Sequence, residues 1–393
     1  MFFLIVVITS LVLIPTLVLL TEVFGSLWAG ASSAGDDRVS AGRVAVVVPA
    51  HNESIGIIPT LQDVASQLRE CDRMIVVADN CCDDTGPVSA AHGAHVLPRN
   101  EPDRRGKGYA MAWAIAHLKD DPPEFVLFVD ADCRLQQGFL AKTLNYCART
   151  GEPIQALYLM TSAEGFQVNQ CVAEFAWRLK NWVRPLGLNH FGRPVQLMGT
   201  GMMFPWEVIK SAPLASGHIV EDLKLGLDLV LTGTPARFLP TVRITSEFAT
   251  TERGAESQRQ RWIEGHLAMI VSYVPRLLVS SIATRNFDAL VLALDLLVPP
   301  LSLLMAIAGG VAVLGGAYAL LAGALLPAAL AILNLSALAA ALTLAWLKFG
   351  RDILPASQIP FVARQILRRF HLLRHLARRG SSEWIRTDRS RPD

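Results

Sequence analysis

The sequence predicts an α/β domain with a parallel sheet, placed between apolar segments that cross a membrane. Three observations support this prediction. Strand-like and helix-like segments alternate in the middle of the chain, which is typical of a parallel sheet with helices on both faces. Acidic and amide residues directly follow the strand-like segments. Long stretches without charged residues lie at 2–20 and across most of 289–347.

The apolar segments are long enough to cross a bilayer. Hydrophobic residues make up 52% of the 393 residues. At a rise of about 1.5 Å per residue, residues 2–20 just span a hydrocarbon core about 30 Å thick. A cleaved signal peptide is the alternative, but the segment lacks a cationic start. Residues 290–313 and 318–347 are expected to form two further helices, with a kink at Pro299-Pro300 and a turn near Gly309-Gly310 or Gly315-Gly316.

Charge distribution suggests which side of the membrane the middle domain occupies. From Lys348 to the end the chain carries 11 basic and 4 acidic residues, whereas the remainder carries 25 basic and 30 acidic residues. Basic residues beside an apolar segment indicate the cytoplasmic side and favour anionic lipid headgroups. No nucleic-acid recognition motif accompanies them, so nucleic acid is not an expected partner. Residues 364–379 combine Arg with apolar residues and predict an amphipathic helix lying on the membrane.

Four regions are therefore expected in a protein of the inner (plasma) membrane. They are a membrane helix at 1–28, a cytosolic domain at 40–275, two membrane helices at 288–347 and a basic cytosolic tail at 348–393. The six cysteines show neither metal-ligand spacing nor a secreted pattern, and we expect them to be reduced. Asp295 lies at or near the membrane, where it lines a functional path or occupies the interface.

Each element of the middle domain follows from its hydrophobic pattern. The expected strands are 43–50, 74–78, 95–97 and 125–129, and the expected helices are 54–69 and 108–118. No Gly-x-Gly-x-x-Gly follows the first strand, which disfavours a dinucleotide-binding fold. Ligands of parallel sheets bind at the carboxyl ends of the strands, where the polar residues of this chain are found.

A pair of carboxylates follows the strand at 125–129. Strand alternation would place Asp130 and Asp132 on one face. Carboxylate oxygens suit Mg²⁺ or Mn²⁺, and such an ion would neutralise a diphosphate. A solvated turn is an equally common explanation of an isolated Asp-x-Asp.

Other polar residues complete a possible nucleotide pocket. Asp79, at a neighbouring strand end, could accept a hydrogen bond from a uracil ring, and Glu53 could contact the base or ribose. Lys107 lies between two glycines and could pair with phosphate. Each of these residues alone is as consistent with a surface role.

Two further motifs could act on a second substrate, the acceptor of a transferred group. Glu221-Asp222 precedes a helix-like segment and supplies either an N-cap or a general base. On a helix, Gln258, Arg261 and Trp262 share one face, where Arg261 could stabilise a leaving diphosphate and Trp262 could stack on a sugar. The alternative is an interfacial helix with Arg and Trp at headgroup level.

The ordered set of motifs resembles membrane-bound family 2 glycosyltransferases, among them cellulose, hyaluronan and chitin synthases and bacterial exopolysaccharide enzymes. The resemblance covers residues 43–262, the flanking spans and the closing Trp384-Ile385-Arg386-Thr387. It rests on these motifs in this order: Pro49-Ala50-His51-Asn52-Glu53, Asp79, Lys107-Gly108, Asp130-Ala131-Asp132, Gly199-Thr200-Gly201, Glu221-Asp222 and Gln258-x-x-Arg261-Trp262.

The resemblance implies a GT-A fold, a UDP-sugar donor, Mg²⁺ or Mn²⁺, and inversion at the anomeric carbon. It implies a lipid-linked or polysaccharide acceptor, with membrane lipids as further partners. The implied donor-binding residues are Pro49, Ala50, Asn52, Glu53, Asp79, Lys107, Asp130 and Asp132, of which Asp130 and Asp132 also bind the metal. The implied acceptor-binding residues are Thr200, Gly201, Gln258 and Trp262, and the implied catalytic residues are Asp222 as base, Glu221 and Arg261.

Three expected spans are fewer than the large synthases of the family carry, which leaves processive synthesis open. A single-addition enzyme similar to ceramide glucosyltransferases is one alternative. A transporter component and a nucleotidyltransferase are alternatives of other classes.

Overall fold

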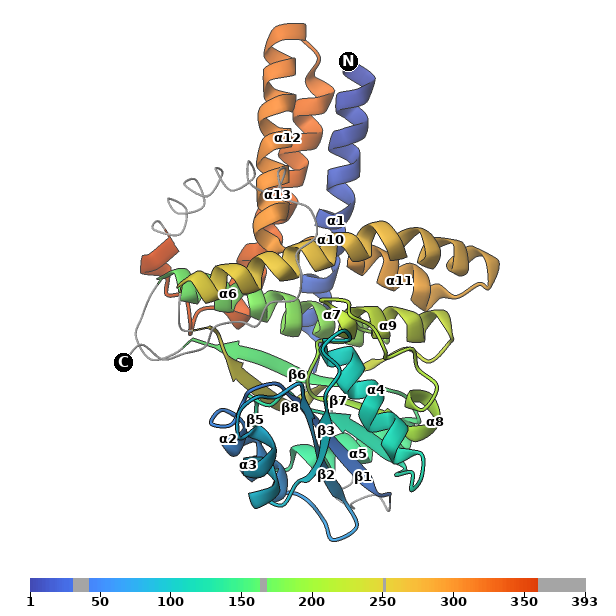
Figure 1. Ribbon diagram of the computed structural model, residues 1–393. Coiled ribbons are helices and arrows are strands. Elements are labelled where there is room, and N and C mark those ends of the chain that lie inside the picture. Colours follow the sequence, from blue (N-terminus) through green and yellow to red (C-terminus); the bar gives the residue numbers. More distant parts are fainter. Residues whose placement is uncertain (31–41, 163–167, 250–251, 360–393) are drawn as a thin grey trace.

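The computed structural model describes residues 1–30, 42–162, 168–249 and 252–359 of the 393-residue chain. The expected amphipathic helix at 364–379 and the Trp384–Thr387 motif lie outside these residues. In the described part, a layered α/β domain carries a bundle of long apolar helices on one side (Figure 1).

Eight strands form one sheet in the described part of the chain. The strands are β1 (Val44–Ala50), β2 (Arg73–Asp79), β3 (His95–Arg99), β4 (Phe125–Phe128), β5 (Arg134–Leu135), β6 (Ile154–Thr161), β7 (Met202–Pro205) and β8 (Arg237–Glu247). Their order across the sheet is β3-β2-β1-β4-β7-β6-β8-β5.

The four expected strands all form, and they pair in parallel as β3-β2-β1-β4. The predicted parallel pairing holds for these four strands but does not extend over the whole sheet, because β7 runs antiparallel to both β4 and β6. The hydrophobic pattern of a buried strand is the same in either direction, so the sequence could not reveal this reversal. The result is a mixed, Rossmann-like sheet.

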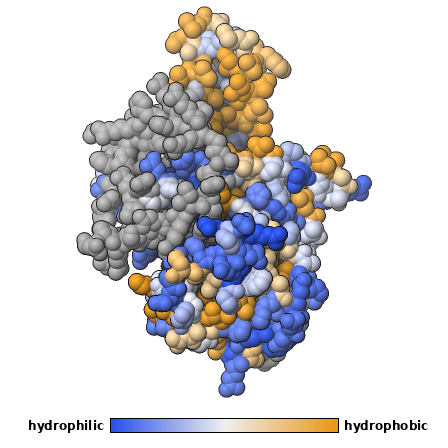
Figure 2. All heavy atoms as spheres, in the orientation of Figure 1, coloured by the Kyte–Doolittle hydropathy of each residue, from blue (hydrophilic) through white to orange (hydrophobic). Residues whose placement is uncertain are grey.

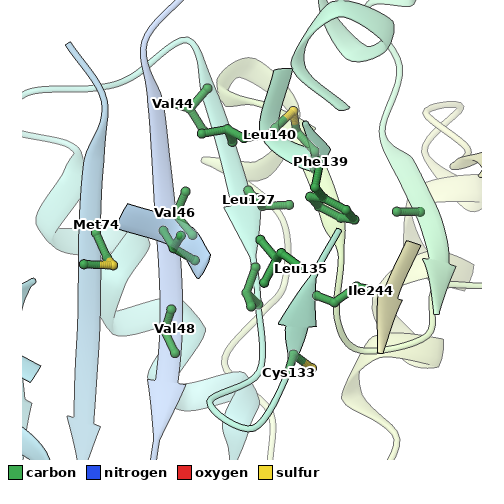
Figure 3. Packing of buried hydrophobic residues seen from close by; sticks show 14 of the residues in the cluster. Val44, Val46, Val48, Met74, Leu127, Cys133, Leu135, Phe139, Leu140 and Ile244 are labelled. Atoms are coloured by element: carbon green, nitrogen blue, oxygen red, sulfur yellow. The ribbon is translucent and has the colours of Figure 1, made fainter. Parts of the chain in front are cut away.

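Alternate residues of β1 pack into different cores, which explains its continuous apolar sequence. Val44, Val46 and Val48 contact one cluster of buried side chains, and Ala45 and Val47 contact the cluster on the opposite face. Figure 3 shows the first cluster, in which side chains of β1 and β4 face those of the helix that follows β5. Full burial of one such valine contributes about 1.5–3 kcal/mol.

Helices cover both faces of the sheet. One cluster includes side chains of α2 (Ile57–Ala65) and α5 (Phe139–Thr150), and the other includes side chains of α4 (Lys107–Leu118), α8 (Trp206–Ile209) and α9 (Glu221–Leu231). The short α3 (Thr85–Ala91) packs beside α2 and β3. α6 (Val168–Arg178), a π-helical segment (Leu179–Val183) and α7 (Arg184–His190) follow one another directly between the sheet and the apolar bundle.

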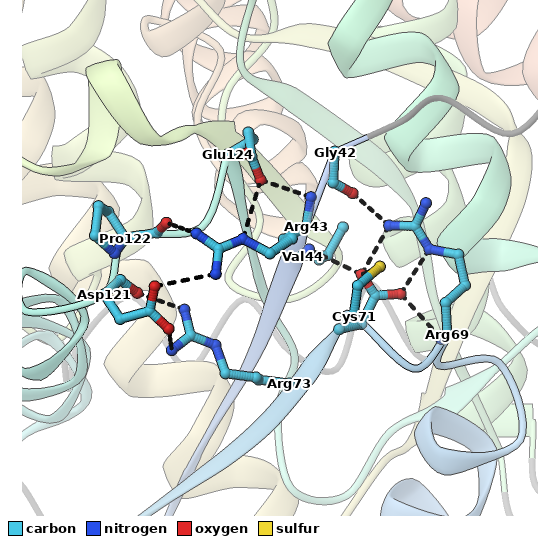
Figure 4. Close-up of polar contacts among 10 residues, drawn as sticks. Gly42, Arg43, Val44, Arg69, Cys71, Arg73, Asp121, Pro122 and Glu124 are labelled. Carbon is cyan, nitrogen blue, oxygen red and sulfur yellow. Dashed lines mark hydrogen bonds and ion pairs between the residues drawn. The ribbon is translucent and has the colours of Figure 1, made fainter.

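Ion pairs join the strand ends at the amino edge of the parallel strands, opposite the edge expected to bind ligands (Figure 4). Asp121 pairs with Arg43 at 3.0 Å and with Arg73 at 2.9 Å. Asp72 pairs with Arg69 at 2.7 Å and accepts a hydrogen bond from the Val44 backbone at 2.9 Å. These contacts fix the entrances of β1 and β2 relative to each other.

Four helices in the described residues are long and apolar enough to cross a membrane. α1 (Phe2–Trp28), α12 (Leu301–Ala322) and α13 (Leu325–Phe349) pack together and project from the domain as an apolar bundle (Figures 1 and 2). α10 (Glu252–Ala283), whose segment 256–283 is the fourth candidate, runs across the foot of this bundle beside α11 (Phe287–Leu296) (Figure 1).

The helix boundaries expected near the C-terminus are wrong. The segment expected as one helix at 290–313 divides at Pro299-Pro300, since α11 ends at Leu296 and α12 begins at Leu301. A proline that removes a backbone donor favours this break. The turn to α13 falls at Gly323, with φ +68°, and not at the earlier glycine pairs. Gly315 instead lies against α13, where an added Cβ would be 2.9 Å from the Pro327 carbonyl oxygen.

Asp295 lies in a buried charged cluster that joins the bundle to the domain. Arg184 of α7 donates to Glu22 of α1 at 2.6 Å and also forms an ion pair with Asp295 of α11. Gln196 donates to the second carboxylate oxygen of Asp295 at 2.6 Å. Asp295 therefore occupies the junction between α1, α7 and α11.

Candidate active site

A cleft of about 320 Å³ lies at the carboxyl edge of β1 and β4, between the sheet and α10. It brings together residues from the strand ends, from the starts of α4 and α9, from the π-helical segment and from α10. The sequence-predicted residues that line it are Pro49, Glu53, Lys107, Asp130, Asp132, Glu221, Asp222, Gln258, Arg261 and Trp262. The predicted residues Ala50, Asn52, Asp79, Thr200 and Gly201 are not among its lining.

Asp130 and Asp132 meet through a turn. β4 ends at Phe128, and the Cys133 amide donates to the Asp130 carbonyl at 3.3 Å, so strand alternation is not what brings the carboxylates together. Carboxylate oxygens of both residues lie within 4.8 Å of each other and of the Cys133 sulfur. Both side chains are half-buried, which leaves them accessible from the cleft.

The carboxylates of Asp130 and Asp132 suit a hard divalent cation, whereas the Cys133 thiol does not. Burial, together with the nearby Asp132, raises the pKa of the Cys133 thiol, and this thiol contacts the Thr200 hydroxyl at 3.4 Å. A protonated thiol is a poor ligand for Mg²⁺ or Mn²⁺, whereas carboxylate oxygens are preferred ligands of both ions.

Lys107 is the first residue of α4 and lies between Asp130 and Glu221. Its ammonium donates to the Gly199 carbonyl at 2.8 Å, forms an ion pair with Asp130 and lies 3.9 Å from Glu221. Burial would lower the pKa of Lys107, but Asp130 and Glu221 more than compensate, so this pKa is raised. Lys107 is therefore a fixed positive charge.

Glu221 and Asp222 occupy the first turn of α9. Val220 holds the N-cap position and no side chain caps this helix, so the N-cap interpretation of the two acids is wrong. Burial and the adjacent Asp222 raise the pKa of Glu221 to about 8. Burial also raises the pKa of Asp222, although Lys107 opposes the shift. Raised carboxylate pKa values are typical of groups that accept protons near neutral pH.

Asp79 lies at the end of β2 with only 7% of its surface exposed. Its carboxylate pairs with Arg99 and accepts a hydrogen bond from the side-chain amide of Asn80 at 2.8 Å. Burial raises the pKa of Asp79, and Arg99 opposes the shift. Arg99 belongs to no sequence motif, and its pairing with Asp79 depends on the alignment of β2 with β3.

Thr200 and Gly201, the expected acceptor contacts, are buried and do not line the cleft. Thr200 is fully buried, and its hydroxyl accepts a hydrogen bond from the Asp130 amide at 3.0 Å. Gly201 is also buried, beneath Ile244 and Phe139. The Thr200 hydroxyl is already bonded to the Asp130 backbone, so Thr200 supports the turn that carries the carboxylates.

Gln258, Arg261 and Trp262 line the cleft from α10, which confirms that they share one helix face. The Trp262 ring lies 4.9 Å from the Trp177 ring of α6, centroid to centroid. Trp177 also lines the cleft, and its indole nitrogen donates to the Tyr158 carbonyl at 3.2 Å. These rings form an aromatic wall that the sequence analysis foresaw only in Trp262.

Lys180 and His266 are further cleft residues that the sequence analysis missed. His266 lies one helical turn beyond Trp262 on α10, so the helical spacing offered a signal for it. Lys180 belongs to no motif, and its place in the cleft depends on the π-helical segment.

The fold and the cleft together define a Rossmann-like α/β protein with an acidic ligand site at the carboxyl edge of its sheet. Residues 41–265 match the family model described as "Glycosyltransferase like family 2". The chain belongs to this family.

Comparison with one solved structure agrees with the fold, and a second similar structure covers a smaller part of the chain. The mannosyltransferase PcManGT from Pyrobaculum calidifontis, in complex with GDP-Man and Mn²⁺, is 20% identical, with a TM-score of 0.51 over 88% of this chain and 97% of that chain. Glucosyl-3-phosphoglycerate synthase from Mycobacterium tuberculosis is 25% identical, with a TM-score of 0.37 over 50% of this chain and 68% of that chain. No curated protein sequence matches the chain.

Proposed function

We propose that this glycosyltransferase transfers a sugar, with inversion, from a UDP-sugar to a hydroxyl group of a lipid-linked or polysaccharide acceptor at the cytoplasmic face of the membrane. One observation carries the proposal. A single cleft holds an acidic pair at a strand end, a second acidic pair with raised pKa values at a helix start, and the Gln-x-x-Arg-Trp face of α10.

Asp222 is the proposed general base. It removes a proton from the acceptor hydroxyl as the oxygen forms a bond to the anomeric carbon and the bond from that carbon to UDP breaks. Its raised pKa gives it the proton affinity that this step requires. Glu221 shares the buried acidic environment, and Lys107 limits how far both carboxylates become protonated.

Arg261 and Lys107 are proposed to stabilise negative charge on the departing UDP. Asp130 and Asp132 would hold Mg²⁺ or Mn²⁺, which when bound supplies positive charge at the diphosphate. Pro49 and Glu53 line the cleft at the end of β1 and are proposed to contact the nucleoside.

The remaining predicted donor residues act from outside the cleft lining in this proposal. Asp79 would contact uracil while it keeps its ion pair with Arg99. Ala50 and Asn52 would shape the loop that follows β1.

The acceptor is proposed to bind between Asp222 and the aromatic wall. Gln258 and Trp262 line this part of the cleft, and aromatic faces suit the flat sides of sugar rings. α10 runs across the foot of the apolar bundle, so an acceptor held at the membrane surface can reach the cleft (Figure 1).

The test is nucleotide release and product formation by the purified full chain in nonionic detergent, with extracted membrane lipid as acceptor. A panel of UDP-glucose, UDP-galactose, UDP-N-acetylglucosamine and GDP-mannose identifies the donor, and mass analysis of the product gives the number of sugars added. Asp222→Asn should reduce transfer by about 10²–10⁴-fold, the usual contribution of a general base. UDP affinity should stay the same, and the exposed Asp120→Asn should behave like the unchanged protein.

Three results would contradict the proposal. Loss of UDP binding in Asp222→Asn would assign Asp222 to the donor pocket. Formation of a nucleotide sugar from a nucleoside triphosphate and a sugar phosphate would indicate a nucleotidyltransferase. Solute flux through vesicles without nucleotide release would indicate a transporter.

A further inference from the structure

A cation that the proposed mechanism does not use faces the cleft. Lys180 lies in the π-helical segment between α6 and α7 and lines the cleft with an exposed side chain. Within the described ranges it forms no ion pair with a carboxylate. Its ammonium lies 5.9 Å from the centroid of the Trp177 ring, on the aromatic wall.

The charge of Lys180 is poorly balanced by the protein. The side chain has surface open to the cleft, but the cleft walls surround its ammonium. This loss of contact with water lowers the pKa of Lys180, and Asp222 opposes only part of that shift. Lys107 shows the opposite behaviour, because Asp130 and Glu221 raise its pKa. A cation in the cleft with too little opposing charge is suited to bind an anion that enters with a substrate.

A second donor without an acceptor lies next to Lys180. Asn181 is 1% exposed, and its amide nitrogen has no hydrogen-bond partner in the part of the chain that the structure describes. The residue lines both the cleft and an adjoining cavity of about 20 Å³. A buried donor without an acceptor is destabilising, so an acceptor atom of a ligand is its natural partner.

The backbone that presents these two donors is unusual. The segment Leu179–Val183 is π-helical within a run of α-helix. Such one-turn insertions change the direction of side chains and are frequent at functional sites. Here two consecutive residues of the insertion line the cleft.

The location of Lys180 favours the acceptor over the donor. Lys180 lines the adjoining cavity together with Arg184 and Asp295, and it lines the cleft together with Asp222, which acts on its ammonium. Asp222 is the proposed base for the acceptor hydroxyl, while Arg184 and Asp295 belong to the junction with the membrane bundle. On the donor side of the cleft, Lys107 already supplies a positive charge beside Asp130.

We propose that Lys180 and Asn181 bind an anionic group of the acceptor, a phosphate or a carboxylate, and thereby place a neighbouring hydroxyl at Asp222. The inference rests on the proposed function. It restricts the acceptor to an anionic molecule, such as a lipid-linked sugar phosphate or a glycan that contains a uronic acid.

A binding experiment tests this inference without catalysis. Calorimetry measures glucose 1-phosphate, glucuronate and glucose against the full chain in nonionic detergent, with UDP and Mn²⁺ at saturation so that the donor phosphate site is filled. At least one of the two anions should bind more tightly than glucose, and the tighter one indicates which acidic group the natural acceptor carries.

Substitutions assign the binding to Lys180. Lys180→Met should weaken binding of the anion by roughly tenfold or more, as expected for loss of a charge-assisted hydrogen bond. Lys180→Arg should keep most of the affinity, and the exposed Lys119→Met is the matched control. If Lys180→Met does not fold, Asn181→Ala removes only the neutral donor. This variant should still weaken binding of the anion while binding of glucose stays the same. Equal affinity for glucose and both anions, or unchanged affinity in the folded variants, would overturn the inference.

An activity experiment separates this inference from the proposed function. Anion exchange divides the extracted lipid into neutral and anionic fractions, and the unchanged protein should glycosylate only the anionic one. Lys180→Met should raise the acceptor KM and leave the donor KM unchanged. Transfer to the neutral fraction alone would refute the inference and support the proposed function. Absence of transfer with every donor and fraction would refute the proposed function, and the binding experiment would then decide the anion site by itself.

Discussion

Substitution of Gly199 tests whether Asp222 must hold its present position. Gly199 has φ +94°, and a Cβ added there would lie 3.2 Å from a carboxylate oxygen of Asp222 and 3.4 Å from the Lys107 ammonium. Gly199→Ala should therefore push the carboxylate by a few tenths of an ångström. Gly93→Ala is a matched control, because Gly93 has φ +83° and nothing lies within 4 Å of its added Cβ.

The two variants should lose similar stability and very different amounts of activity. An L-residue in the left-handed region costs about 1–2 kcal/mol, so both variants should show a similar decrease in Tm. A 1 Å misplacement of a catalytic group can cost about 10²-fold in rate, and a 0.3 Å displacement scaled in the same way costs about fourfold. We expect Gly199→Ala to lose at least this factor in kcat, and Gly93→Ala to keep the original kcat.

The assay is UDP release at saturating donor and acceptor, with Tm measured on the same preparations. If both variants keep full activity, the close approach to Asp222 does not matter for the reaction. If both lose activity equally, the cause is backbone strain alone, and the proposed role of the Asp222 position is wrong.

Three further predictions concern charge. Arg184→Met leaves Glu22 and Asp295 buried without their partner and should lower the free energy of unfolding by about 3–5 kcal/mol. Loss of the partly exposed Arg193–Asp288 pair in Arg193→Met should cost about 1 kcal/mol or less. Equal decreases in Tm for the two variants would contradict this prediction. The activity of a carboxylate base is lost as pH falls through its pKa, and burial raises the pKa of Asp222, so the acidic limb of kcat/KM should lie above the usual range of an aspartate. Lys180 lowers the pKa of Asp222, and Lys180→Met should therefore move this acidic limb to higher pH. A shift to lower pH would refute the assignment of the limb to Asp222. Asp132→Asn should weaken Mn²⁺ binding measured by calorimetry by at least roughly tenfold, and the exposed Asp103→Asn should not.

The parallel half of the sheet could be predicted from the sequence, because a strand that is buried on both faces has a continuous run of apolar residues. Residues 43–50 became β1 almost without change, and the acids that follow 125–129 lie at the cleft. The absence of charge likewise marked the apolar terminal segments. The order of the motifs was sufficient to indicate the family, since each motif is a local feature of the chain.

The sequence alone determined the strands, the apolar segments and the set of chemically active side chains, because these depend on residues close together in the chain. Only the tertiary structure decided which partner each side chain has. It buried Thr200 beneath the Asp130 turn, paired Asp79 with Arg99 across two strands, and reversed β7 within the sheet. It also brought Lys180 into the cleft, since a π-helical turn depends on packing between distant segments and has no local sequence signal.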